Sequence, residues 1–317
     1  MIAGHWSSAR PEEILTTADG EGVPMANDEM PGGRNSVIAL VSCPLQRGVA
    51  ANMTQFVYEL GTDIIEHRQY VDADQNHLFA RLEWQVDPPD IPRETIEENF
   101  RNKLAEPFDM QWSLHFSGDP VRMAVFVTRE MGHLYTLVMH CIARLWNATI
   151  PLIVSNQPYL QAEAERFGIA FQHVPISKEN KAAQERLELE LLQQHAIELV
   201  VLARYMQILS PQIITPYRHR IINIHHSMLP AFAGAQPYRQ AHERGVKLIG
   251  ATSHFVTEDL DEGPIIAQDV AYVNHRKTVD QLIKRGRDLE MVVLARAVDL
   301  YLNRRILVDR KRTIVFD

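Results

Sequence analysis

The pattern of apolar and polar positions divides the chain into two regions with different element orders. In the first region, short apolar runs predict strands, and apolar residues at every third or fourth position predict helices. The predicted elements are a strand at 36–43, a helix at 46–61, two strands joined by a polar turn at 72–77, a helix at 93–108 and a strand at 110–116. This β-α-β-β-α-β order predicts a compact α+β module of the ferredoxin-like kind.

In the second region, strands and helices alternate regularly. The predicted strands are 121–127, 149–155, 170–177, 197–205 and 220–226, and the helices between them include 158–168 and 181–196. The run IELVVLARY at 197–205 is almost continuously apolar, which is typical of a strand covered on both faces. This alternation predicts an α/β, Rossmann-like domain with a mostly parallel, doubly wound sheet.

The turn-forming segment SGDP at 117–120 separates the two regions, and a third kind of sequence precedes them. Residues 1–33 hold one Arg against six carboxylates, with several Gly and Pro and no apolar core of a signal peptide. We therefore predict a flexible acidic leader at 1–34, an α+β domain at 35–117 and an α/β domain at 118–317.

Charge and cysteine content narrow the classes of partner. The formal net charge of −8 and the pI near 6.0 argue against broad binding to nucleic acids or anionic membranes. No apolar run of about 18 residues predicts a membrane span. The basic segment NRRILVDRKR at 303–312 is interpreted as a solvated edge. Cys43 and Cys141 are far apart in apolar stretches, which favours two structural thiols and a cytoplasmic location.

Candidate chemistry follows the strand at 220–226, in the segment RIINIHHSMLPAF. In a doubly wound fold, ligands bind at the carboxyl ends of the strands. Asn223 and His225 are two positions apart, so their side chains share one face and could both donate hydrogen bonds to a developing oxyanion. A metal site of His225, His226 and His254 is disfavoured, because adjacent strand residues point to opposite faces. Ser227 lacks the G-x-S-x-G context of a nucleophile.

A second polar segment, SHFVTEDLDEGPII at 253–266, lies between two apolar strands. It carries four carboxylates, at Glu258, Asp259, Asp261 and Glu262. One of them could fold over the strand ends and orient a water or accept a proton. A solvated turn remains the alternative for the carboxylates, and a structural hydrogen-bonding role remains open for His226 and His254. Amide, imidazole and carboxylate suffice for acyl chemistry without a metal.

These motifs carry a family resemblance. The segments LVVLARYMQILSP at 199–211 and NIHHSMLPAFAGAQPYRQAHERGVKLIGATSHFVTEDLDEGPIIAQD at 223–269 resemble the superfamily of formyltransferases that use 10-formyltetrahydrofolate. The chain looks most like the hydrolytic branch, the formyltetrahydrofolate deformylases, because HHS stands where the transferases typically have His-Pro. Residues 35–85 resemble an ACT domain, which the deformylases carry and the simple glycinamide ribonucleotide formyltransferases do not.

The resemblance implies roles for particular residues. Asn223 would polarise the formyl oxygen, His225 would stabilise or protonate the tetrahedral intermediate, and Asp261 would orient the attacking water and manage its proton. The folate substrate would contact Arg204, Met206, Gln207, Ile208, Leu209, His226, His254, Thr257, Glu258 and Asp259. Neither a metal nor another cofactor is implied.

The implied activity is hydrolysis of 10-formyltetrahydrofolate to tetrahydrofolate and formate, which balances the one-carbon folate pool and supplies formate for purine synthesis. Two alternatives stay open here: a formyltransferase with an amine acceptor, and a regulatory protein that binds an amino acid and folate. The turn CPLQRGV keeps Gly48 as a candidate effector contact but lacks the acidic and Pro residues common in ACT turns. Amino-acid binding and a purely oligomerising role, as a dimer or tetramer, are both compatible with it.

Overall fold

The computed structural model of the chain describes residues 35–86, 91–230 and 237–317. The predicted leader at 1–34 lies outside the described residues. Within 35–317 the strands form a four-stranded sheet, a seven-stranded sheet and a two-stranded C-terminal hairpin. None of the described helices combines the length and apolar character needed to cross a membrane.

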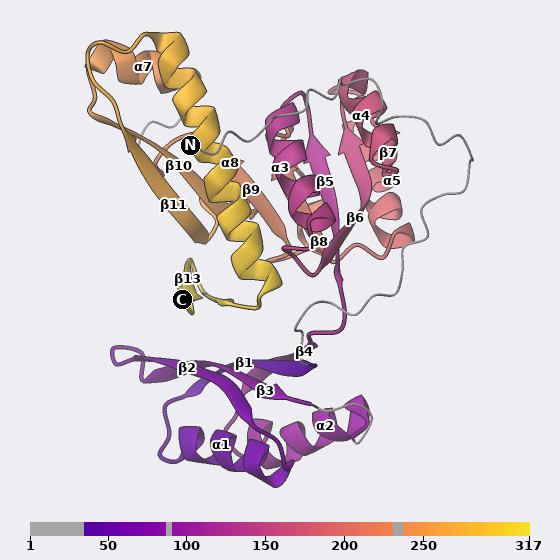
Figure 1. The fold of residues 1–317 in the computed structure, drawn as a ribbon, viewed down its shortest axis with the longest axis vertical. Helices are drawn as coiled ribbons and strands as arrows, with labels where there is room; N and C mark the ends of the chain where they lie inside the picture. The colour runs from indigo at the N-terminus through magenta and orange to yellow at the C-terminus, as the bar shows by residue number, and fades with distance from the viewer. Residues whose placement is uncertain (1–34, 87–90, 231–236) are drawn as a thin grey trace, which may run out of the picture. The chain divides into compact units, whose positions relative to one another are not determined.

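The first sheet belongs to an ACT-like module with the predicted element order (Figure 1). Its elements are β1 (Ser36–Pro44), α1 (Val49–Glu59), β2 (Ile64–Asp72), β3 (His77–Gln85), α2 (Arg93–Phe100) and β4 (Gln111–Phe116). The strand order is β2-β3-β1-β4, and all three pairings are antiparallel. One face of the sheet packs on the helices around Trp84, Phe56 and Phe100, whose rings meet edge to face.

The second sheet has the order β11-β10-β9-β8-β5-β6-β7. Its strands are β5 (Val121–Val127), β6 (Ala148–Ser155), β7 (Ala170–His173), β8 (Leu199–Ala203), β9 (Ile221–His225), β10 (Leu248–Phe255) and β11 (Ile265–Tyr272). The helices are α3 (Met131–Ile142), α4 (Gln161–Arg166), α5 (Lys181–Gln194), α6 (Pro211–Ile214), α7 (Pro237–Arg244) and α8 (Val279–Leu302), and the chain ends in β12 (Ile306–Asp309) and β13 (Arg312–Val315).

Alternate side chains of the central strand β5 point to opposite faces of the sheet, and helices cover both faces. In β5, Met123 and Val125 join the apolar cluster that contains residues of α3 and α8, whereas Ala124 and Phe126 join the cluster that contains residues of α5 and α6. Figure 1 shows α3 and α8 on the same side of the sheet. Because both faces are buried, the strands read as the continuous apolar runs seen in the sequence.

The predicted fold class is confirmed, with differences in detail. The strands β9-β8-β5-β6-β7 are parallel, and β10 and β11 extend the sheet in antiparallel fashion. The predicted strand at 170–177 ends at His173. The predicted helix at 93–108 becomes α2 followed by a π-helical turn at Arg101–Ala105. Ends of elements depend on local capping, which apolar periodicity does not encode.

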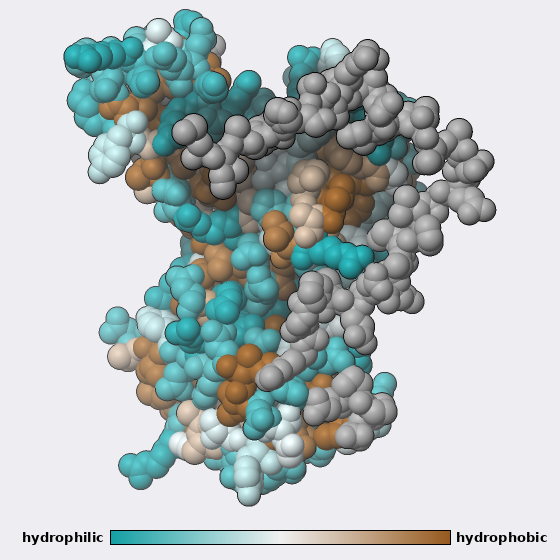
Figure 2. Space-filling view, in the orientation of Figure 1, coloured by the Kyte–Doolittle hydropathy of each residue, from teal (hydrophilic) through white to brown (hydrophobic). Residues whose placement is uncertain are grey.

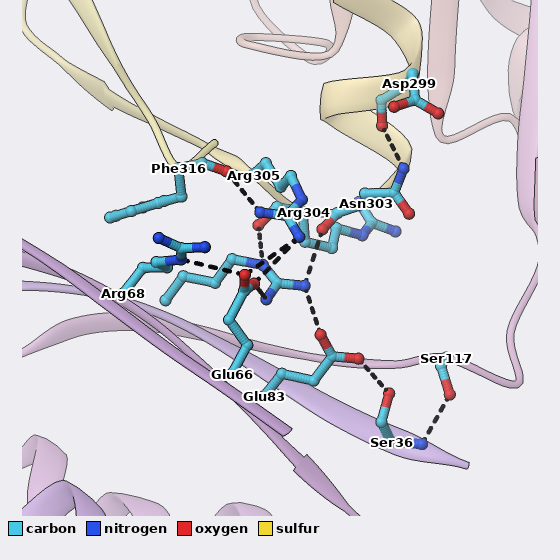
Figure 3. Close-up of polar contacts among 11 residues, drawn as sticks. Ser36, Glu66, Arg68, Glu83, Ser117, Asp299, Asn303, Arg304, Arg305 and Phe316 are labelled. Carbon is cyan, nitrogen blue, oxygen red and sulfur yellow. Dashed lines mark hydrogen bonds and ion pairs between the residues drawn. The ribbon is translucent and has the colours of Figure 1, made fainter. Parts of the chain in front are cut away.

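A buried ion-pair cluster joins β3 of the ACT-like sheet to the end of α8 (Figure 3). Arg81, whose side chain is 3% exposed, pairs with Glu66 and with Glu83, the latter at 2.8 Å. Its guanidinium also donates to the backbone carbonyls of Asn303 and Arg304, each at 3.2 Å. These contacts satisfy the buried cation from several sides, as a buried charge requires.

The interpretation of 303–312 as a solvated edge is wrong for much of that segment. Arg305 pairs with Glu66 at 3.1 Å, and Arg312 pairs with Asp72 on β2. Ile314 and Phe316 pack with Leu40 and Phe79 on the face of the ACT-like sheet away from its helices. The basic residues therefore find their partners in strands more than 200 positions earlier in the chain, which no local pattern reveals.

Replacing Arg81 tests this junction. Arg81→Ala should lower the free energy of unfolding by about 3 kcal/mol, because Glu83 would lose its ion-pair partner and the carbonyls of Asn303 and Arg304 would lose their donor. Arg68→Ala is the matched control: Arg68 also contacts Glu66, at 3.2 Å, but its side chain is 54% exposed. It should cost less than about 0.5 kcal/mol. Denaturant unfolding of both variants measures the difference, and equal costs would contradict a structural role for the buried cluster.

Candidate active site

A cavity of about 700 Å³ lies where β8 and β9 end. Its walls are the segment that follows β8, the end of β9, part of β10, the turn after β10 and one side of α8. The lining residues are Leu202, Arg204, Tyr205, Met206, Gln207, Ile208, Leu209, Asn223, Ile224, His225, His226, Tyr238, His254, Val256, Thr257, Glu258, Asp259, Leu260, Asp261, Ile283 and Arg287. A cavity at the carboxyl ends of parallel strands is the usual ligand site of an open α/β sheet.

The register between β9 and β10 assembles the polar floor of this cavity. His254 is the cross-strand partner of Asn223, and Thr252 is the partner of His225. Directly opposed residues in an antiparallel pair project from the same face. The Asn223 Nδ2 atom therefore lies 3.2 Å from Nε2 of His254, although the residues are 31 positions apart in the chain.

Asp261, in the turn after β10, completes the polar group that Asn223, His225 and His254 form. One carboxylate oxygen, Oδ2, lies 3.3 Å from Nδ1 of His225, and the other, Oδ1, lies 3.6 Å from Nε2 of His254. Asp261 has φ +57°, a left-handed conformation that is uncommon outside glycine. The hydrogen bond from His225, with His254 close by, holds the pKa of this carboxyl well below its usual value. The carboxylate is therefore ionised at neutral pH.

The hydrogen bonds of His225 and His254 show which of their ring nitrogens donate and which accept. Nδ1 of His254 lies 2.9 Å from the Phe255 carbonyl, which only accepts, so this nitrogen carries the proton. In neutral His254, Nε2 then accepts from the Asn223 amide, which leaves the second N–H of that amide for a substrate. Nδ1 of His225 donates to Asp261, and its buried Nε2 has no hydrogen-bond partner among the described residues. Asn223 and His225 thus both keep a polar atom for a ligand.

His226 does not point away from His225 as an unbroken strand would require. Strand β9 ends at His225, so the next residue turns, and the two rings stack with centroids 5.0 Å apart and 26° between their planes. The expectation of opposite faces is therefore wrong. Burial, with Arg204 nearby, lowers the pKa of His226 to about 4, so its ring is neutral near pH 7.

Two buried carboxylates on α5 hold the segment that follows β8. Glu185 accepts hydrogen bonds from the backbone N–H of Ser210, at 2.8 Å, and from its hydroxyl. Glu188, fully buried, accepts from the Tyr205 hydroxyl at 2.7 Å. Met206 and Ile208, held between these anchors, are 63% and 60% exposed and line the cavity. These apolar side chains offer a surface on which a flat ligand ring can lie.

The structure brings the predicted site residues together around one cavity. All of the residues named for catalysis and folate contact, from Arg204 to Asp261, line it. Gly48 lies elsewhere, at the start of α1, with φ +93°. Ser227 is buried and is absent from the described residues that line the cavity. In the described ranges, no three His, Cys, Asp or Glu side chains form a group that could hold a metal ion.

Sequence reasoning missed several members of the site. Tyr238 comes from α7, and Ile283 and Arg287 come from α8. Glu290 and His133 lie behind the cavity wall: Glu290 accepts from Tyr238 at 2.7 Å and from Arg204 at 3.1 Å, and His133 lies 3.5 Å from it. In the sequence, Glu290 is a carboxylate among the apolar positions of a long helix. Its partners could not be identified until the position of α8 was known.

Gly263 provides a test of how the Asp261 turn is positioned. A Cβ built on this residue would overlap the backbone carbonyl oxygen of Phe255. Gly263→Ala should therefore move the turn, reduce activity and destabilise the fold by about 1–3 kcal/mol. Gly61→Ala is the control, because φ there is +73° but a Cβ would meet open space; it should cost about 1 kcal/mol and leave activity intact. Full activity of the Gly263 variant would contradict this.

The pKa of His226 predicts how stability depends on pH. The unfolded chain binds a proton at this histidine below pH about 6.5, whereas the folded protein does so only near pH about 4. The unfolded state binds more protons in this window, so stability falls as pH falls from about 6.5 to 4. His226→Gln should flatten this slope by up to about 1.4 kcal/mol per pH unit. Denaturant unfolding between about pH 7 and 5 tests it, with exposed His275→Gln as control; parallel curves would contradict it.

Comparisons with known proteins identify the family of the chain. The pattern of the family described as Formyl transferase matches residues 121–298. The formyltetrahydrofolate deformylase of Synechocystis sp. is 49% identical over 277 residues, which cover 87% of this chain and 97% of that protein.

Solved structures extend the likeness to three dimensions. The crystal structure of a formyltetrahydrofolate deformylase from Pseudomonas syringae is 38% identical, with a TM-score of 0.87, and the match covers 90% of this chain and 96% of that one. Glycinamide ribonucleotide transformylase 1 from Symbiobacterium toebii is 31% identical, with a TM-score of 0.60, and covers 65% of this chain and 98% of that one. Because the matches to the Synechocystis and Pseudomonas syringae proteins span both the ACT-like module and the catalytic domain, the chain belongs to the formyltetrahydrofolate deformylase family.

Proposed function

We propose that this chain hydrolyses 10-formyltetrahydrofolate to tetrahydrofolate and formate, and so balances the one-carbon folate pool and supplies formate for purine synthesis. The observation that carries the proposal is the contact of Asp261 with His225 at 3.3 Å, beside the free donor of Asn223. Relatives named formyltetrahydrofolate deformylase, up to 49% identical, support it. The transferase and sensor alternatives are less favoured, since neither explains a match to hydrolases over both domains.

The geometry suggests a role for each group in the reaction. The Asn223 amide, and Nε2 of His225 once that ring carries a second proton, would donate to the formyl oxygen, where charge develops as water attacks the carbon. The Asp261 carboxylate, ionised and in reach of the cavity, would orient that water and accept its proton. The C–N bond to N10 then breaks, N10 receives a proton, and formate leaves with release of one proton at neutral pH. We propose that no metal or other cofactor takes part.

Substrate binding would use the two walls of the cavity. The pterin ring fits between the segment Arg204–Leu209 and the turn at 257–261, because one wall is apolar and the other presents backbone and side-chain polar groups. His226 and His254 would support the catalytic groups from behind. The anchoring of the first wall by Glu185 and Glu188 would keep it ordered before the substrate arrives.

We further propose that the ACT-like module forms a dimer or tetramer. β2 is an edge strand and exposes Ile64, Ile65, Tyr70 and Val71, each between 38% and 48%. Figure 2 shows apolar patches that interrupt the otherwise mostly hydrophilic surface of this module. Edge strands with apolar side chains favour pairing with another strand. An amino-acid effector near Gly48 and a cytoplasmic location, which the free thiols of Cys43 and Cys141 suit, are also proposed.

Formate release by the purified protein tests the activity. With 10-formyltetrahydrofolate, a chelator and no acceptor amine, the wild type should release formate. Asp261→Asn and His225→Ala should each lower turnover by at least about 10²–10³ while folding normally, because each removes a group that acts in the transition state.

Glu262→Gln is the matched control for the aspartate variant. It makes the same chemical change one residue later, on a side chain that is 63% exposed and contacts Lys311. It should retain wild-type turnover. Retained activity in the Asp261 variant would refute the assigned roles, whereas loss of activity on chelation would refute the metal-free mechanism.

A further inference from the structure

A buried polar cluster of four residues lies behind the catalytic histidines. Its centre is Glu290 on α8, which is 0% exposed. One carboxylate oxygen accepts from the Tyr238 hydroxyl at 2.7 Å, and the other accepts from the Arg204 guanidinium at 3.1 Å. His133, from α3 and 1% exposed, places Nε2 at 3.5 Å from Glu290. Four segments far apart in the chain thus meet at one buried carboxylate.

This cluster stands between two cavities. Arg204 and Tyr238 line the cavity of about 700 Å³ that contains Asn223 and His225. His133 lines a second cavity, of about 570 Å³, with Glu130, Gly132, Asp280, Lys284, Asp288 and Met291. Ile283 and Arg287 line both cavities, so the two are neighbours. Glu290 contacts Arg204 and Tyr238 of the first cavity and His133 of the second, so the cluster lies between the two cavities. We call these four residues the partition.

The backbone of Arg204 has an unfavourable conformation, which indicates that the structure requires the arginine side chain at this position. Arg204 has φ +61°, in the left-handed region where glycine is favoured and other residues cost about 1–2 kcal/mol. Such strain persists where the surrounding structure requires it, and it concentrates at functional sites. The side chain is 19% exposed and pairs with the fully buried Glu290. A glycine would fit the backbone better but would leave a gap in the wall.

The packing of Tyr238 closes the partition from the other side. A Cβ built on Gly286 would overlap the Tyr238 ring and hydroxyl, so α8 admits this ring only because residue 286 lacks a side chain. The ring centroid of Tyr238 lies 6.2 Å from that of His226, which in turn stacks on His225. The wall is therefore continuous from the catalytic histidine to α8.

We propose that the Arg204–Glu290 pair, with Tyr238 and His133, decides the acceptor: the partition admits water to the formyl carbon and excludes a primary amine seated in the second cavity. This inference rests on the proposed hydrolysis. The second cavity, of about 570 Å³, is large enough for a small amine.

Opening the partition would change the products of the reaction in a defined way. When a primary amine attacks, a new C–N bond forms between the formyl carbon and the amine, and the bond to N10 breaks. The proton lost by the amine goes to N10, so tetrahydrofolate and an N-formyl amine form in place of formate. The groups that serve the attack of water, Asn223, His225 and Asp261, can serve this attack as well, since the same tetrahedral centre develops.

The test compares product ratios in the wild type and the double variant Arg204→Gly/Glu290→Gln. Glycine suits the positive φ, and glutamine avoids an unpaired buried charge while it still accepts from Tyr238. Each purified enzyme is incubated with 10-formyltetrahydrofolate and glycinamide, and N-formylglycinamide and formate are quantified by mass spectrometry. The ratio of N-formylglycinamide to formate should rise at least about tenfold in the variant and increase with glycinamide concentration.

Two further variants make the result decisive. Arg310→Gly makes the same change at another left-handed arginine, φ +55°, which is exposed and far along the chain in the C-terminal hairpin; its ratio should equal that of the wild type. Tyr238→Ala keeps both members of the Arg204–Glu290 pair and removes only the Tyr238 ring and its hydrogen bond to Glu290; it should raise the ratio in the same direction, and it decides the question if the double variant does not fold.

The outcomes separate this inference from the proposed function. A wild type that releases no formate without an amine refutes the hydrolysis, and the inference with it. An unchanged ratio in active partition variants refutes the inference alone. Loss of both products in folded, folate-binding variants also refutes it, because the cluster would then position the catalytic groups and not select the acceptor. A product ratio is insensitive to a general loss of activity, so a merely structural role would not raise it.

Discussion

The site depends on one carboxylate that contacts histidines on two neighbouring strands. Asp261 lies within 3.3 Å of His225 on β9 and within 3.6 Å of His254 on β10, and its own backbone is held in a left-handed conformation. The antiparallel register of β9 and β10 puts the two histidines on one face, and the close approach of Gly263 to Phe255 fixes the turn that carries the aspartate. A water-activating carboxylate needs this placement, because a shift of about 1 Å at a catalytic group has large effects on rate.

Buried carboxyl groups organise the rest of the catalytic domain in the same way. Glu185, Glu188 and Glu290 are each at most 2% exposed, and each accepts hydrogen bonds from a segment that lines the cavity. Buried carboxylates destabilise a fold unless they are paired, so they tolerate few alternative arrangements of their partners. Order in the cavity walls therefore follows from the cost of leaving these groups unpaired.

Helix α8 connects the site with the ACT-like module. Ile283 and Arg287 line the cavity, Glu290 supports its wall, and the residues after the helix, Asn303 and Arg304, accept hydrogen bonds from Arg81. One continuous helix of 24 residues thus contacts the site at one end and leads into the junction at the other.

Local patterns in the sequence suffice to predict the element order, the fold class and the polar groups at the ends of β9 and β10. Period-2 and period-3.6 patterns, the apolar run before Asn223 and the carboxylate-rich turn are local features, and a strand fixes that Asn223 and His225 share a face. The contact between Asp261 and His225, the stacking of His226 on His225, and the convergence of Arg204, Tyr238 and His133 on Glu290 depend instead on tertiary packing. The pairing of the basic C-terminal segment with β2 and β3 depends on it as well. Register between strands and contacts between distant segments depend on the packing of the whole sheet, which no single stretch of residues specifies.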